Sequence, residues 1–167
     1  MAFDRTRTLR GALAGSVAAG VWLAQQPLDK RAFGLDYDDA ELLGRLVARG
    51  RPGAPALGVL LHVQNGALFG ALYAGLAPSL PVPRTLRGPL AGLGEHLVTW
   101  PAMALVAPSL WRSGRAFAQA AWRHVLFGAV LGELERRLNP PADELEPVSE
   151  EAVASNGHGS VAHLVAS

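Results

Sequence analysis

Four long apolar stretches constrain this 167-residue chain more than any other feature. Each is close to the roughly 20 residues that an α-helix needs to cross a hydrocarbon core. The second is free of charge between Arg51 and Arg84, and it shows no polar face at the 3.6-residue helical period. We therefore predict an all-α, polytopic membrane bundle of four transmembrane helices, at about 9–28, 55–77, 89–110 and 116–137.

Composition favours this prediction over its alternatives. Only 17% of the residues are charged, against about a quarter in an ordinary soluble domain. One alternative is a soluble bundle of Ala- and Gly-rich helices. Another is that the first stretch, preceded by Arg5, Arg7 and Arg10, is a signal peptide. The absence of cysteine excludes disulfides and thiolate sites.

The charges divide the chain into two parts. Residues 140–167 carry five acids and no base, in a composition that cannot bury enough surface to order itself. We predict a membrane domain over 1–139 and a disordered acidic tail over 140–167. The basic residues lie between the apolar stretches and not in one patch, so the expected partner is the lipid bilayer and not nucleic acid.

The chain shows an internal repeat. The pattern H-V-x-x-G-A-x-x-G occurs at 62–70 and 124–132, and R-G-x-L-A-G occurs at 10–15 and 87–92. The offsets of 62 and 77 residues differ by the extra length of the first loop. The pattern predicts a duplicated two-helix hairpin, with chance similarity among Ala/Gly/Leu-rich segments as the alternative.

Each expected helix also carries a G-x-x-x-G pair, which lets helix backbones approach closely in lipid. We expect these glycines to hold a compact bundle together and to support a homo-oligomer or a membrane partner. They are Gly11 and Gly15, Gly66 and Gly70, Gly88 and Gly92, and Gly128 and Gly132.

The first loop is expected to hold a short amphipathic helix over about 36–49. Asp36 is its expected N-cap, with acids in the first turn and arginines near the end, as the helix dipole favours. Such a helix suits the membrane interface. A cation site at its acidic residues is the alternative.

Prolines and basic residues give weaker signals. Pro27 and Pro89 mark expected helix ends, and Pro101 is expected to kink the third helix. The positive-inside rule gives seven basic residues on each side of the membrane, so orientation is tied. The first charges usually dominate, which favours both termini inside.

Ionisable and polar residues within the apolar stretches are the candidate site. Such residues are costly to bury and mark functional positions by default. They are His62, Asn65, Glu95, His96, Arg123 and His124, with Glu133 near the end of the fourth helix. The three histidines fall in the middle third of the expected membrane and are able to approach one another.

Three interpretations of these histidines stay open. They act structurally, they form a proton-responsive cluster with Glu95, or they bind a metal or haem. Arg123 either pairs with Glu95 or extends towards the membrane surface. No catalytic motif appears, so we expect no enzyme, and we assign no metal and no cofactor to this site.

The H-x-x-x-G-x-x-x-G pattern, the Gly-rich first helix ending at Pro27 and the proline within helix three resemble the YagU-like group of small four-helix bacterial inner-membrane proteins. The resemblance covers about residues 8–138. It implies a multi-pass protein of the bacterial cytoplasmic (inner) membrane with an undefined biochemical role, and it supplies no catalytic residues.

Together these features predict a non-enzymatic bundle with a structural or envelope-stress role. The alternatives are a proton-coupled or pH-gated transport component that uses the intramembrane histidines, and a haem- or metal-binding membrane subunit.

Overall fold

The computed structural model describes residues 4–48 and 51–140, and all regular structure in these ranges is helical. The all-α prediction is confirmed. Apart from position 140, the predicted tail lies outside the described residues. The elements are α1 (Arg5–Phe33), α2 (Asp39–Ala48), α3 (Ala54–Leu76), η1 (Ala77–Ser79), α4 (Arg84–Thr99), η2 (Trp100–Ala102), α5 (Met103–Val106), α6 (Pro108–Trp111) and α7 (Gly114–Leu138).

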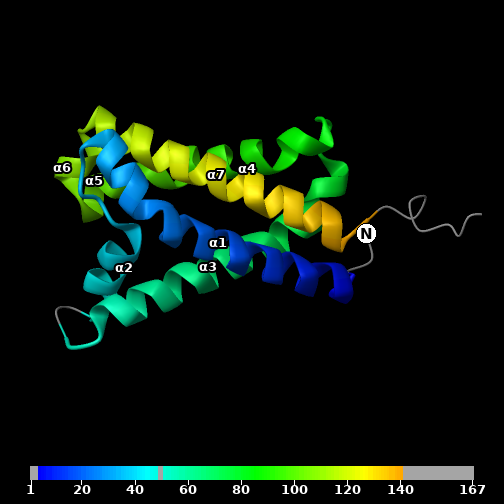
Figure 1. Cartoon of the computed structure of the whole chain (residues 1–167), viewed down its shortest axis with the longest axis horizontal. Helices are drawn as coiled ribbons and strands as arrows, with labels where there is room; N and C mark the ends of the chain where they lie inside the picture. Colours follow the sequence, from blue (N-terminus) through cyan, green and yellow to red (C-terminus); the bar gives the residue numbers. More distant parts are fainter. Residues whose placement is uncertain (1–3, 49–50, 141–167) are drawn as a thin grey trace, which may run out of the picture.

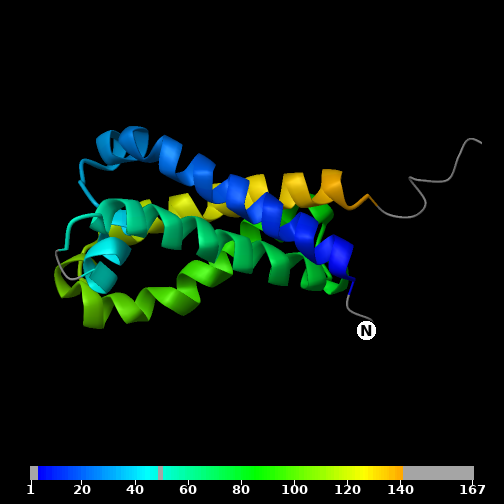
Figure 2. The same cartoon turned by 90° about the horizontal axis from the view of Figure 1, so that it is seen from below.

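The four long helices lie lengthwise in two antiparallel pairs (Figure 1). Helix α1 packs on α3, α4 packs on α7, and α1 also contacts α7, which joins the pairs. Helices α1 and α3 lie close where α1 begins and diverge towards the other end, where α2 lies beside them (Figures 1 and 2).

The α1–α3 pair meets on its glycines. A Cβ atom added at Gly15 would lie 2.9 Å from the carbonyl carbon of Gly66, and one added at Gly70 would lie 2.9 Å from the Cα atom of Gly15. Side chains do not fit at such distances. The two backbones therefore touch directly, as small residues permit between apolar helices.

The α4–α7 pair also meets on its glycines, with a pairing that differs by one helical turn from that of α1–α3. A Cβ atom at Gly128 would lie 2.8 Å from the carbonyl carbon of Gly88, and one at Gly92 would lie 3.0 Å from that of His124. Both helix pairs thus close on glycines of the G-x-x-x-G pattern. These glycine faces are covered within the chain, and the expectation of a homo-oligomer stays a prediction. An oligomer would need another surface.

The packing buries many small residues and leaves many large apolar side chains exposed, around a core that also holds Trp22, Tyr73, Phe127 and Leu131. Ala14, Ala18 and Ala120 are almost fully buried, whereas the side chains of Leu72 and Leu105 are 67% and 87% exposed. By length and composition, one helical segment in the described part, Ala54–Ser79, is able to cross a membrane.

Prolines and glycines set the helix ends differently from the prediction. Helix α1 does not end at Pro27; it runs on to Phe33 and ends at Gly34, whose φ of 62° is left-handed. Helix α4 does not begin at Pro89 but at Arg84, after Pro83. The third predicted helix, 89–110, is broken: α4 stops at Thr99, just before the expected kink at Pro101.

Helix α2 begins later than expected. Its first turn is capped by Asp38, whose Oδ1 accepts a hydrogen bond from the Glu41 amide at 2.9 Å, and not by Asp36. Asp36 instead pairs with Lys30 at 2.9 Å. The helix packs on α3 through Gly44, where a Cβ atom would lie 3.3 Å from the Cα atom of Gly58.

Candidate functional site

A cavity of about 330 Å³ opens beside the histidines, between α1, α2, α3, α4, α5 and α7. One part of its wall is polar and the rest is apolar. The polar wall comprises Tyr37, Asp39, His62, Asn65, Glu95, His96, Thr99 and His124, and the apolar wall includes Trp22, Leu42, Leu43, Leu46, Trp100, Met103, Val106 and Phe127.

The glycine contacts place the three histidines at one level. His62 lies one helical turn before Gly66, and His124 lies one turn before Gly128. His96 lies one turn after Gly92 on α4, which runs antiparallel to α7. Residues four apart share a helix face, so each imidazole lies one helical turn from a glycine at which two backbones touch.

Trp22 of α1 joins the histidines into one group. Its ring centroid lies 5.0 Å from that of His62 and 4.7 Å from that of His124, and the His124 ring lies 5.0 Å from the His96 ring. Helices α1, α3, α4 and α7 thus each contribute one ring. The structure brings together the three histidines, as their estimated depths had suggested.

The ring nitrogens are only partly bonded. His124 Nδ1 lies 2.8 Å from the Ala120 carbonyl oxygen, so Nδ1 carries the hydrogen and the neutral ring offers Nε2 as an acceptor. His62 Nε2, His96 Nε2 and Trp22 Nε1 are buried, and no described group bonds to them. A buried polar atom without a partner costs about 1–3 kcal/mol, so these atoms require an explanation.

Glu95 and Asn65 also line this cavity, on α4 and α3. Glu95 is half-buried and Asn65 is exposed. Within the described ranges, the Glu95 carboxylate makes no ion pair or hydrogen bond. Glu133 lies elsewhere, on the surface, where it pairs with Arg136 and Arg137.

Arg123 belongs to a separate, buried ion-pair network. Its Nε and one Nη donate to Asp29 at 2.6 Å each, and its other Nη donates to Asp39 at 2.7 Å. A further bond of 2.9 Å reaches the Tyr37 carbonyl oxygen. The Arg123 side chain is 0% exposed. It therefore neither pairs with Glu95 nor extends to the surface, and both expectations for it are wrong.

This network holds one wall of the cavity. Asp39 begins α2 and, with Tyr37, lines the cavity, while Arg123 fixes both to α7. Burial acts to raise the pKa of Asp29, but hydrogen bonds from Arg123 and Gln119 outweigh it and leave that pKa below its ordinary value of 3.8. Asp29 is therefore charged at neutral pH, as its partner requires.

Sequence reasoning missed Asp29, Asp39 and Trp22. The sequence did contain a signal for Trp22 and Asp29. Gly15, Trp22 and Asp29 follow one another at intervals of seven residues, which puts Trp22 and Asp29 on the same helix face as that packing glycine. Pro27 had appeared to end the helix before Asp29. A second signal came from topology. The first loop, which contains Asp39, and the start of the predicted fourth helix, which contains Arg123, lie at the same end of the bundle, so that an acid is able to pair with Arg123.

Metal binding receives no geometric support in the part of the chain that the structure describes. No three His, Cys, Asp or Glu side chains there are placed to hold one ion. The three histidines contact one another through Trp22 and ring faces rather than around a common point.

Comparison of the chain with protein-family models, with curated proteins and with solved structures finds no match. The functional argument therefore rests on the residues and geometry above.

Proposed function

We propose that the chain is a four-helix, multi-pass membrane protein whose histidine-lined cavity binds a small, partly apolar ligand in a proton-dependent way, as a transport component does. The observation that carries this proposal is the convergence of His62, His96 and His124 on one cavity.

The exposed leucines support the membrane part of the proposal. Large apolar side chains cover the outside of α1, α3 and α4, while many of the buried positions are alanine, glycine or paired charges beside a core of Trp22, Tyr73, Phe127 and Leu131. A soluble bundle would show the reverse pattern. Helices α1, α3 and α7 have 29, 23 and 25 residues, each long enough to cross about 30 Å of hydrocarbon.

The cavity supports the binding part. The side chains of His62, His96 and Trp22, whose buried nitrogens have no partner among the described groups, line the cavity, and the leucine and methionine wall offers a ligand apolar contact. The charged and titratable groups that line the cavity are Asp39, Glu95 and the three histidines, with Tyr37 beside them. Histidine changes charge near physiological pH, so occupancy and proton uptake are coupled here.

Proton flux into liposomes tests the proposal. The full chain is reconstituted, a potassium diffusion potential is applied, and internal pH is followed with a trapped dye. We expect a flux that depends on external pH. The paired change His62→Gln and His124→Gln should abolish it, whereas His163→Gln, in the predicted tail, should leave it intact. Absence of flux in the unmodified protein, or flux that survives the paired change, would contradict the proposal.

A non-enzymatic structural role is the second candidate. The observation that favours it is the close glycine packing of both hairpins, which builds a rigid bundle without any ligand. A normal fold together with the absence of flux and of ligand binding would favour this candidate.

A further inference from the structure

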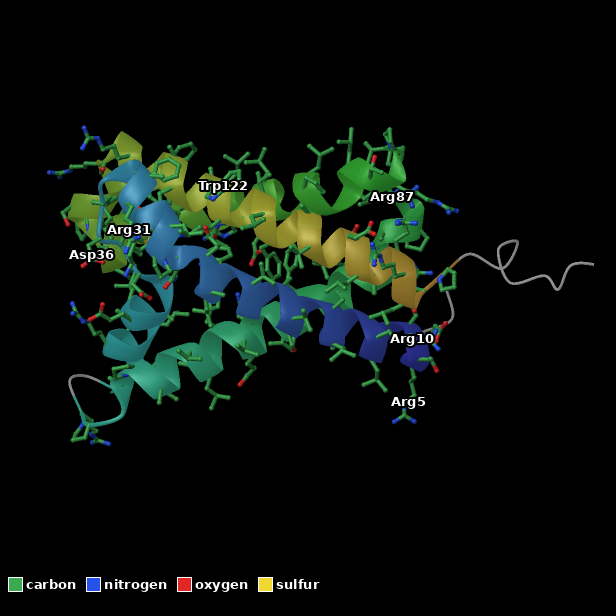
Figure 3. All side chains as sticks on the ribbon, viewed as in Figure 1. Arg5, Arg10, Arg31, Asp36, Arg87 and Trp122 are labelled. Carbon is green, nitrogen blue, oxygen red and sulfur yellow. The ribbon has the colours of Figure 1, made fainter. Side chains whose placement is uncertain are left out.

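A second cavity, of about 210 Å³, lies at the end of the bundle where α1 begins and α7 ends. We call it the arginine cavity, because it is lined by Arg7, Arg84, Arg87 and Arg136, together with Tyr73 and Glu135. Figure 3 shows Arg87 at this end, with Arg5 and Arg10, and Arg31 and Asp36 at the opposite end.

Two lining residues of the arginine cavity, Arg87 and Tyr73, have hydrogen-bond donors without an acceptor in the described part of the chain, whereas Arg136 pairs with Glu133. Glu135 is the one carboxylate among the described residues that line it, and it already accepts bonds from Arg7 and from Asn139 Nδ2. Arg87 uses only its Nε, which donates to the Val82 carbonyl oxygen at 3.1 Å. In the described part of the chain, its two terminal nitrogens and the Tyr73 hydroxyl group make no hydrogen bond.

This surplus of donors fits an anion with several oxygens. A guanidinium group binds phosphate through parallel N–H bonds, and such charge-assisted bonds are the strong ones. Basic pockets between transmembrane helices at a membrane surface are suited to lipid headgroups.

The surroundings of the arginine cavity favour a lipid over free phosphate. Leu9, Leu76 and Leu86 lie on the same helix ends and are 69%, 63% and 49% exposed. An acyl chain next to a bound headgroup would contact these side chains. Free phosphate would gain nothing from them.

We infer that the arginine cavity binds the phosphate group of an anionic phospholipid, with its acyl chains against the neighbouring leucines. The inference rests on the membrane placement proposed above but not on the histidine cavity.

Native mass spectrometry of the full chain in detergent tests the inference, with phosphatidylglycerol and phosphatidylcholine of equal chain length as probes. We expect preferential binding of phosphatidylglycerol. Arg87→Gln should weaken it about tenfold, the loss of one charge-assisted hydrogen bond. Arg31→Gln, the same charge change at the opposite end, should have no effect. Tyr73→Phe supplies a second, milder variant if Arg87→Gln does not fold.

Three results would overturn the inference. They are equal binding of both lipids, an equal loss from Arg31→Gln, and binding of inorganic phosphate as tight as that of the lipid. The last result would assign the arginine cavity to a free anion. Because lipid preference and proton flux are measured separately, failure of the histidine proposal is distinguishable from failure of this one. A chain that stays soluble without detergent would remove both.

Discussion

Replacement of Arg123 by leucine should be among the most destabilising single changes in this protein. The change removes three hydrogen bonds to carboxylates and one to the Tyr37 carbonyl oxygen. It leaves Asp29, whose side chain is 1% exposed, without its counter-charge. Removing one partner of such a buried pair costs about 3–5 kcal/mol.

A double substitution at Arg123 and Asp29 separates two costs, the loss of the ion pair and the burial of an unpaired carboxylate. If most of the cost is the unpaired Asp29 carboxylate, then Asp29→Leu combined with Arg123→Leu should recover more than half of the lost stability, because the carboxylate that remains, Asp39, is 16% exposed and is partly solvated. Arg136→Leu is the matched control. Arg136 is 45% exposed where it pairs with Glu133, and such a surface pair is worth about 0–1 kcal/mol.

The assay is equilibrium unfolding in mixed micelles, with helix content followed by circular dichroism as a denaturing detergent is added. A cost below about 1 kcal/mol for Arg123→Leu would refute the account of a tightly paired, buried guanidinium. The same conclusion would follow if the two leucine changes were simply additive.

Three further outcomes are expected. Gly128→Ala should cost about 1–3 kcal/mol in the same unfolding assay, because its Cβ atom would press on the Gly88 backbone; Gly94→Ala, with open space around it, should be neutral or stabilising, and equal effects would count against close packing. The pKa values of Asp29 and Asp38 are lowered in the fold: at Asp38, burial acts to raise the pKa, but bonds from the Glu41 amide and Lys30 outweigh it. The contribution of these two carboxylates to stability should therefore be complete above their ordinary pKa of 3.8, and it should be lost as the pH falls through their lower pKa values in the folded state. A melting temperature that stays constant down to pH 3 would contradict this. Asp39→Asn should loosen α2 and speed proteolysis after Arg45, whereas Glu41→Gln, at an exposed pair, should not.

The sequence was sufficient to predict the helical class and the glycine contacts, because two helix backbones touch only where residues have no side chain, and such positions are visible as glycines in the sequence. The two matching patterns at His62 and His124 indicated equivalent positions, and the structure places both rings against Trp22. Four membrane spans, the duplication and the inner-membrane location remain predictions.

Pairing between distant charges was harder to foresee. Arg123 and Asp29 are 94 residues apart, and their contact depends on α1 continuing past Pro27, which local rules disfavour. Helix α2 was predicted, but its place beside the cavity follows from Gly44 meeting α3 at Gly58. Neither glycine belongs to a G-x-x-x-G pair, so the sequence pattern gave no reason to pair them.

Cross-linking of the histidine positions tests the central claim most directly, because the chain contains no cysteine. His96→Cys and His124→Cys are introduced together, and the protein in lipid is treated with the shortest bifunctional thiol reagent. The ring distance of 5.0 Å predicts an intramolecular cross-link in the intact mass. Gly20→Cys with His96→Cys is the control, since Gly20 has nothing within 4 Å of its Cβ position. Two separately modified thiols in the histidine pair would contradict convergence of the histidines on one cavity.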